Sequence, residues 1–345
     1  MEKQFITNIK PLGFTWETSN PFLYCVHHQD NYPKGNAQLG PNASLEGRDI
    51  GQDFTGKDGW RMYHGDVIPG FPAHPHRGFE TVTIVLDGFV DHSDSHGAAG
   101  RYGMGDVQWM TAGSGLQHAE MFPLLNQDRP NQVELFQIWL NLPASKKFAA
   151  PYYKMLWAEE IPQLFFVNKD GSGTTVKQIA GNYYDAQALP PAPDSWAADP
   201  ENDVAIWLIS MDPGSLWKVP ETKEGTHRDL FFFEGSQLTA SGVSIPPYHK
   251  FTADTNQAIE LQAGNEPIRL LMLQAKPINE PVAQYGPFVM NTQKEIYDAY
   301  AEFRVNQFGG WPWPQLGPVH PAKRGRFARY ADGVEEIRES RSEND

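Results

Sequence analysis

The chain has 345 residues, and because single cores stop growing at roughly 300, this length indicates about two domains. Its 31 glycines and 28 prolines favour short strands over long helices. Its formal net charge of −14 argues against nucleic-acid binding, and no run of about 18 apolar residues could cross a membrane. Cys25 is alone, which excludes disulfides and cysteine-based zinc sites within one chain.

The first 57 residues combine one strand signal with a long polar stretch. Phe22–Val26 is apolar and predicts a strand. From Gln29 to Lys57 the composition is rich in Gly, Asn and Asp, with almost no apolar periodicity. We expect a long loop or insertion there, of the kind that can form a lid.

Strand signals are dense from Trp60 onward. Thr81–Leu86 is rich in β-branched residues and ends at the turn dipeptide Asp87-Gly88. Asp106–Thr111 and Val133–Leu142 follow with no helical pattern between them. This regular spacing predicts an antiparallel sandwich or barrel.

The same texture resumes after a linker at residues 143–153. The further strands expected are Gln163–Val167, Thr174–Ile179, Val204–Ile209, Asp229–Phe233 and Ile268–Leu273. A second barrel of the same architecture, from a diverged duplication, accounts for them.

A few short helices are expected near the C-terminus, and one signal for them is the clearest. Thr292-Gln-Lys-Glu295 matches a capping box, and apolar residues follow it at helical spacing. The charged tail after Lys323 predicts a frayed end. The expected division is a metal-binding barrel at 1–143, a metal-free barrel at 144–291, and a helix with an extended tail at 292–345.

Two pairs of polar residues carry the chemistry. His74 and His76 are two apart, as are His118 and Glu120, and residues two apart in a strand share a face. Three imidazoles and a carboxylate on converging strands would suit Fe, Zn, Mn, Ni or Cu and leave positions open for catalysis. One such pair alone would favour ordinary polar residues on an exposed strand, whereas two pairs favour a metal site.

Glu80 competes with Glu120 as the carboxylate ligand. It lies four residues after His76 and would also face inward on a strand. The spacing alone does not decide between them. His64, His92 and His96 lie nearby without the paired spacing and are candidates for supporting or lid roles.

At these residues the sequence resembles the pirin family of bicupins. The matching stretches are His74–Thr83, Gly105–Gly115, His118–Met121, Leu135–Trp139 and, for the C-terminal signature, Tyr285–Thr292. The resemblance implies two cupin-type antiparallel β-barrels, with a mononuclear metal, usually Fe(II), in the N-terminal barrel only. It also implies the ligands His74, His76, His118 and Glu120, which makes Glu80 a neighbour that orients an imidazole by hydrogen bonding.

The resemblance implies a dioxygenase that cleaves flavonols such as quercetin with dioxygen. Glu120 would take the proton of the flavonol hydroxyl. Phe71, Phe79 and Met110 are candidates for an apolar substrate pocket, with core packing as the alternative for each.

A non-enzymatic alternative also follows from the resemblance, because some family members look like iron-dependent regulatory or interaction proteins. The enzyme interpretation is favoured because a four-ligand site with open positions suits small molecules. A small aromatic substrate and dioxygen are the expected partners, with a protein partner in the alternative and no nucleic acid or membrane. The N-terminal residues lack a secretory signal, so a cytoplasmic location is expected.

Overall fold

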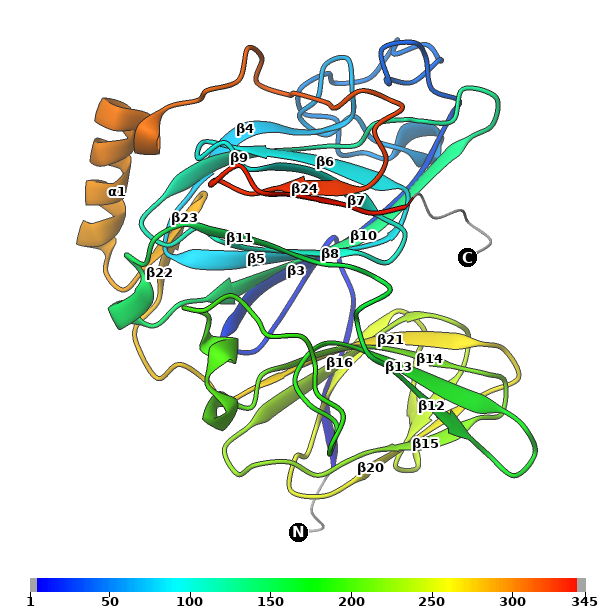
Figure 1. Ribbon diagram of the computed structural model, residues 1–345. Coiled ribbons are helices and arrows are strands. Elements are labelled where there is room, and N and C mark those ends of the chain that lie inside the picture. The colour runs from blue at the N-terminus through cyan, green and yellow to red at the C-terminus, as the bar shows by residue number, and fades with distance from the viewer. Residues whose placement is uncertain (1–4, 340–345) are drawn as a thin grey trace. The chain divides into compact units, whose positions relative to one another are not determined.

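The computed structural model describes residues 5–339, and its paired strands are antiparallel, which confirms the expected all-β class (Figure 1). The chain forms two compact units. Of the described residues, the N-terminal barrel unit comprises 27–138, 142–158 and 280–339. The C-terminal barrel unit comprises 5–26, 139–141 and 159–279.

The units interleave along the chain, unlike the contiguous division expected at 143 and 291. The cause is strand pairing at the chain ends. β1 (Ile6–Pro11) pairs with β19 (His249–Ala253), which places the N-terminal segment in the C-terminal barrel unit. β24 (Phe327–Arg329) pairs with β7 (Ala99–Gly103) in the N-terminal barrel unit.

Two sheets form the barrel of the N-terminal barrel unit, apart from a two-stranded hairpin at residues 283–290. One includes the strands in the order β11-β8-β5-β10-β3, and the other runs β25-β24-β7-β6-β9-β4. Their remaining bounds are β3 (Phe22–Tyr32), β4 (Gly70–His76), β5 (Phe79–Asp87), β6 (Phe89–Asp94), β8 (Val107–Thr111), β9 (Leu116–Met121), β10 (Asn131–Asn141), β11 (Tyr152–Leu156) and β25 (Glu335–Ile337). Buried side chains that include Val85, Tyr102 and Leu135 form its core.

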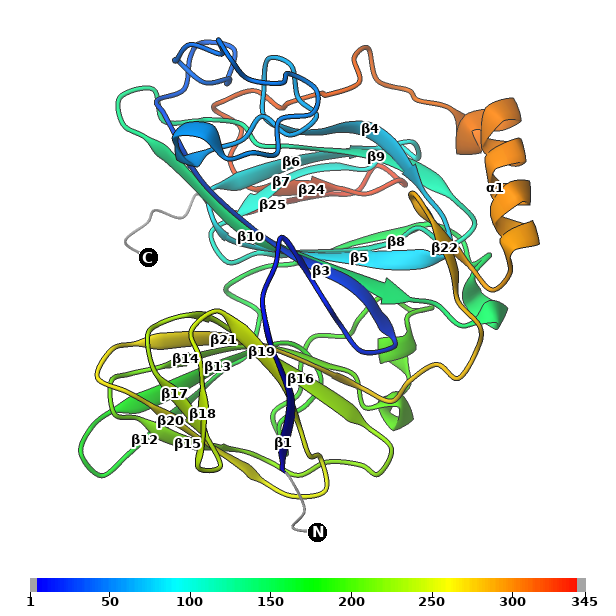
Figure 2. The same ribbon diagram turned by 180° about the vertical axis from the view of Figure 1, so that it is seen from behind.

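The C-terminal barrel unit also contains two sheets, ordered β1-β19-β16-β21-β14-β13-β12 and β15-β20-β17-β18 (Figure 2). Their bounds are β12 (Gln163–Val167), β13 (Gly173–Ala180), β14 (Ala205–Met211), β15 (Leu216–Val219), β16 (His227–Glu234), β17 (Leu238–Ala240), β18 (Val243–Ile245), β20 (Ile259–Ala263) and β21 (Ile268–Ala275). The short strand β2 (Thr15–Trp16) is in neither of these sheets and pairs with β3. Alternate residues such as Trp207, Leu230 and Met272 face inward and fill the core.

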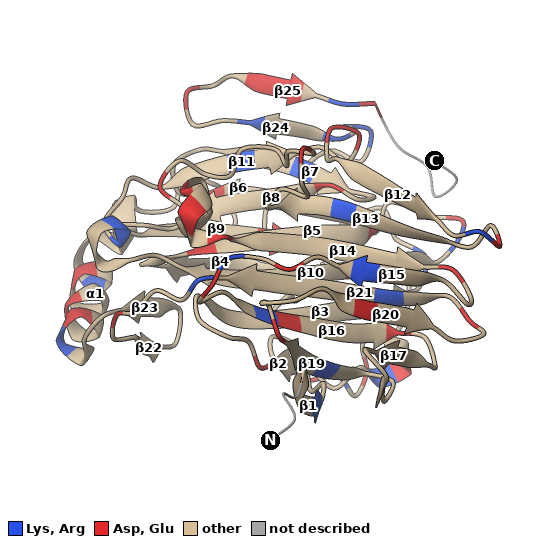
Figure 3. Cartoon of the chain, turned by 90° about the horizontal axis from the view of Figure 1, so that it is seen from below, with Lys and Arg blue, Asp and Glu red and all other residues tan. Residues whose placement is uncertain are grey.

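The expected helix is α1 (Gln293–Asn306). The Thr292 side chain accepts from the Glu295 amide, and the Glu295 side chain accepts from the Thr292 amide, which confirms the capping box. The helix carries charges of both signs on its surface (Figure 3). The hairpin of β22 (Ala283–Tyr285) and β23 (Phe288–Met290) precedes it. No helix among the described residues is long and apolar enough to cross a bilayer.

Short 3₁₀ turns occupy several connections, at Lys57–Gly59, Ala144–Lys146, Trp196–Ala198, Pro200–Asn202 and Gln307–Gly309. The first begins at Lys57, the last residue of the polar segment expected to be a loop. Strand β3 runs into that segment as far as Tyr32, and irregular backbone follows up to β4. Arg48 anchors the loop, since its guanidinium lies 3.3 Å from the Trp60 ring centre and pairs with Asp53 at 2.8 Å.

The prediction of a frayed tail after Lys323 is wrong for the residues up to 339. Arg326 is buried and donates twice to the Asp106 carboxylate, at 2.6 and 2.8 Å. Arg101 binds Asp91 in the same bidentate manner and also donates to backbone carbonyls of the segment from His320 to Arg324. The tail is ordered because its charges are paired with buried partners distant in sequence.

We expect Arg326→Ala to destabilise the protein by about 3 kcal/mol or more, because it leaves the buried Asp106 carboxylate without its cation. Urea unfolding would measure the change. Lys294→Ala is the matched control, since the Lys294–Asp298 pair is exposed and should contribute less than about 1 kcal/mol. Equal, small effects of both substitutions would contradict a structural role for the tail.

Candidate metal centre

The centre is built on the antiparallel pairing of β4 with β9. His74 lies opposite His118, and Phe71 lies opposite Glu120. Three residues on β4 therefore match two on β9, so β4 carries a one-residue bulge between Phe71 and His74. Without the bulge Phe71 and His74 would face opposite sides of the sheet, and with it both share the face of His118.

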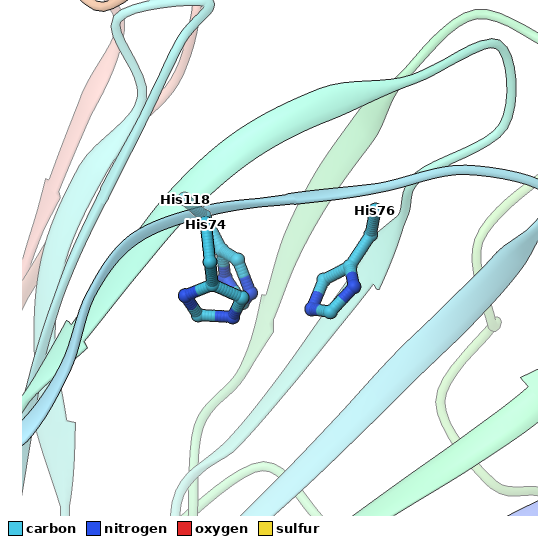
Figure 4. A group of neighbouring side chains, drawn as sticks. All are labelled: His74, His76 and His118. Carbon is cyan, nitrogen blue, oxygen red and sulfur yellow. The ribbon is translucent and has the colours of Figure 1, made fainter. Parts of the chain in front are cut away.

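Three imidazoles converge on this face. His74, His76 and His118 each offer a ring nitrogen, and these nitrogens all lie within 4.8 Å of one another. The ring centres are 4.5 Å apart for His74 and His118, and 5.0 Å apart for His76 and His118. Figure 4 shows the three side chains projecting from their strands to the same side.

Hydrogen bonds to backbone carbonyls orient both imidazole rings on β4. Nδ1 of His74 donates to the Pro72 carbonyl at 2.8 Å, and Nδ1 of His76 donates to the Pro287 carbonyl at 3.3 Å. A proton held on Nδ1 by a backbone carbonyl is the usual arrangement of a histidine that binds a metal through Nε2.

His118 gives the strongest test of whether a metal fits. Its side chain is fully buried, and neither ring nitrogen has a hydrogen-bond partner. Buried polar atoms are rarely left unpaired, because the loss of hydration costs about 1–3 kcal/mol. A cation coordinated by His74, His76 and His118 would remove that cost, so the residues present fit a divalent metal ion.

The three imidazoles are neutral at neutral pH, as metal binding requires. Burial lowers the pKa of His74 to about 4, although its bond to the Pro72 carbonyl opposes the shift. Burial also holds the pKa of His76 and of His118 well below the usual value, and the neighbouring histidines add to the effect.

Glu120 lies beside this triad. Its Oε2 is 3.8 Å from Nε2 of His118 and accepts from Nε2 of Gln137 at 2.6 Å, while Oε1 accepts from the Thr83 hydroxyl at 3.2 Å. Burial raises the pKa of Glu120, and the bonds from Gln137 and Thr83 moderate the rise. A carboxylate held in this way can act as a ligand or accept a proton.

Glu80 is equally buried, and its Oε1 accepts from the Thr111 hydroxyl at 2.7 Å. Thr111 lies opposite Glu80 on β8, in the sheet that does not contain β4 and β9. The group of mutually close donors contains neither Glu80 nor Glu120. Glu120 nevertheless has a contact with a triad imidazole, at 3.8 Å from His118.

The three candidate pocket residues occupy different environments. Phe71 is half-buried, lies 6.4 Å from His74 between ring centres, and lines a small cavity of about 10 Å³ beside Glu120 and Gln137. Phe79 is buried and packs edge-on against His76 at 5.0 Å. Met110 is buried and packs with Ala112 and Leu116. This is the core-packing alternative that the sequence leaves open for it.

His92 is closer to the centre than its sequence position suggested. On β6 it lies opposite Glu120, and Asp94 lies opposite His118. The His92 ring centre is 5.6 Å from that of His118 and stacks on Tyr153 at 4.8 Å. His92 and Asp94 are two residues apart, as are His118 and Glu120, and this spacing is the sequence feature that indicates a place for His92 beside the triad. Gln137 lies within the matching stretch Leu135–Trp139, but that stretch alone does not indicate that its side chain bonds to Glu120.

The sequence matches two family models, Pirin over residues 46–140 and the Pirin C-terminal cupin domain over residues 206–309. A Pseudomonas aeruginosa protein with the provisional name quercetin 2,3-dioxygenase is 36% identical over 249 residues, covering 69% of this chain and 80% of that protein. Pirin from Mus musculus is also 36% identical over 249 residues, covering 70% of this chain and 79% of its own.

A solved structure, quercetin 2,3-dioxygenase from Acinetobacter baumannii, superposes with a TM-score of 0.69 at 25% identity. It covers 88% of this chain and 98% of its own. Together these likenesses confirm the expected fold of two cupin-type barrels.

We expect the protein to bind one divalent ion and His118→Ala to lose it, because the substitution removes the central imidazole of the triad. Metal analysis after dialysis would measure the stoichiometry. His249→Ala is the matched control, since His249 also bonds a proline carbonyl two residues earlier, at 2.9 Å, but lies in the C-terminal barrel unit. Retention of the ion by His118→Ala would refute the site.

The metal-free protein should lose stability as the pH falls. The pKa of His74 is about 4 when folded and 6.5 ordinarily, so between these values the unfolded chain binds more protons. The stability contributed by neutral His74 is complete above about pH 6.5 and is lost as the pH approaches about 4. Thermal unfolding of metal-free protein across this range would show it, and His74→Ala should flatten the dependence. An unchanged slope in that variant would count against the burial effect.

Proposed function

The chain belongs to the pirin family, and from this premise we propose that it is a metal-dependent dioxygenase that cleaves flavonols such as quercetin with dioxygen. The observation that carries the proposal is the convergence of three neutral imidazoles around an unpartnered His118, with a buried carboxylate beside them. The relatives named for quercetin 2,3-dioxygenase support the substrate class.

We assign His74, His76, His118 and Glu120 as the residues that hold the metal. Fe(II) is the ion proposed, by likeness to the family, although a set of imidazole and carboxylate donors also accepts Zn, Mn, Ni or Cu. Bound there, the ion would supply a Lewis acid and a template for oxygen-donor substrates. Open coordination positions would remain for small molecules, because the chain offers four donors.

The chain's own residues supply orientation and proton handling. Backbone carbonyls at Pro72 and Pro287 fix the ring orientation of His74 and His76. Glu120 accepts the proton of the flavonol hydroxyl, for which its raised pKa makes it a stronger base than an exposed glutamate. Gln137 and Thr83 hold the two oxygens of Glu120 throughout.

Aromatic side chains shield the reacting region from water. Phe71 forms an apolar wall beside His74, and Phe79 packs behind His76. A dry site strengthens the electrostatic interactions of the buried carboxylate and limits side reactions. Glu80 bonds to Thr111 and acts, in this proposal, as a supporting neighbour of the donor set.

Iron-loaded protein should redshift quercetin absorption without oxygen and release carbon monoxide when oxygen is admitted. Gln137→Leu should slow the aerobic reaction by about tenfold or more, because Glu120 loses its 2.6 Å hydrogen bond and its position. Gas detection and absorbance would follow both steps.

The matched control is Gln132→Leu, an exposed position on the same strand β10, which should leave the rate unchanged. Absence of both the redshift and carbon monoxide from fully metal-loaded protein would overturn the enzyme. That result would favour the alternative, a non-enzymatic iron-dependent regulatory or interaction protein.

A further inference from the structure

The C-terminal barrel unit contains a second cavity of about 130 Å³. Its size approaches that of an engineered cavity of about 150 Å³ that binds benzene. The lining includes Ala205 of β14, Arg228 of β16 and Gln274 of β21. Arg228 and Ala205 both lie opposite Gln274 in the sheet, so the three side chains share one face.

That face is the inside of the barrel. Two residues along each strand from these positions are Trp207, Leu230 and Met272, which belong to the apolar core. Arg228 therefore lies on the inward face of β16 together with Leu230, at the end of the barrel. An apolar side chain would be expected at such a position.

Arg228 has an unused donor. Its side chain is 1% exposed, and Nη1 is buried with no hydrogen-bond partner. The rest of the guanidinium donates to uncharged acceptors, from Nε to Oε1 of Gln274 at 2.7 Å and from Nη2 to the Pro220 carbonyl at 2.9 Å. Burial lowers the pKa of Arg228 to about 10, and the charges of Asp203 and Asp254 oppose the shift, so the group remains charged at neutral pH. A buried guanidinium in this state requires an acceptor, preferably an anion.

The remaining lining limits what the anion can be. Tyr183, Tyr184 and Trp207 supply aromatic surface suited to a flat ring. Asp203 also lines the cavity, and its Oδ2 accepts from the hydroxyls of Thr222 and Thr226, at 2.6 and 2.7 Å. This negative charge disfavours a dianion such as phosphate and favours a monoanion that can donate a hydrogen bond to the carboxylate.

We propose that this cavity is a binding site for a small hydroxylated aromatic carboxylate. Its carboxylate binds the free donor of Arg228, its ring packs on the tyrosine and tryptophan side chains, and its hydroxyl faces Asp203. The site uses no residue of the metal centre. The C-terminal barrel is thus a ligand-binding module, and the inference does not depend on the proposed dioxygenase activity.

The test is calorimetric titration of the full chain with 4-hydroxybenzoate. The change in total tryptophan fluorescence, to which Trp207 contributes, is a second readout. We expect one site that persists after chelator treatment. Benzoate should bind more weakly because it lacks the hydroxyl. The uncharged 4-hydroxybenzyl alcohol should bind about tenfold more weakly or worse, because it loses the charge-assisted bond to Arg228.

Arg228→Gln should weaken binding of 4-hydroxybenzoate about tenfold or more. Arg269→Gln, at a half-buried position on β21 that does not line the cavity, should leave binding unchanged. If Arg228→Gln fails to fold, Tyr184→Ala carries the test, because Tyr184 is 77% exposed yet lines the cavity.

Three results would overturn the proposal. They are no binding of 4-hydroxybenzoate, binding that changes with neither Arg228→Gln nor Tyr184→Ala, and binding that is lost when the metal is removed. Tighter binding of inorganic phosphate that depends on Arg228 would overturn the carboxylate assignment.

Discussion

The register of β4 on β9, with its one-residue bulge, is the constraint on which the candidate metal centre depends. Side chains alternate along a strand, so a slip of one residue would turn His74 and His76 away from His118. The bulge also brings Phe71 onto the face of the histidines and opposite Glu120. A donor set, an apolar wall and a carboxylate thus share one face because a single extra residue is accommodated in β4.

Burial then sets the chemistry of this face. It keeps the three imidazoles neutral by lowering their pKa and makes Glu120 a better base by raising its pKa. The segment after α1 supports the neighbouring strand β6, since Trp313 donates to the Asp94 carbonyl at 2.8 Å and the His320 amide donates to the Asp91 carboxylate at 2.7 Å. The C-terminal residues thereby hold the strand that flanks β9.

Features of short range could be predicted from sequence, and those of long range could not. The capping box at Thr292 is complete within four residues, and the two-residue spacing of each ligand pair places its members on one face of a strand. The order of the tail after Lys323 could not be predicted, because the partner of Arg326 is Asp106, 220 residues earlier in the chain. The interleaved units could not be predicted for the same reason, since β1 pairs with β19 across more than 230 residues. Local composition carries no information on such partners.

The central claim is that Glu120, and not Glu80, completes the donor set with His74, His76 and His118. X-ray absorption spectroscopy of the iron-loaded protein tests it most directly, through the number of oxygen and imidazole ligands. The account predicts three imidazoles and a carboxylate, with the oxygen shell altered in Glu120→Gln and preserved in Glu80→Gln. Loss of the carboxylate signal in Glu80→Gln, with an unchanged shell in Glu120→Gln, would contradict it and make this an ordinary cupin site.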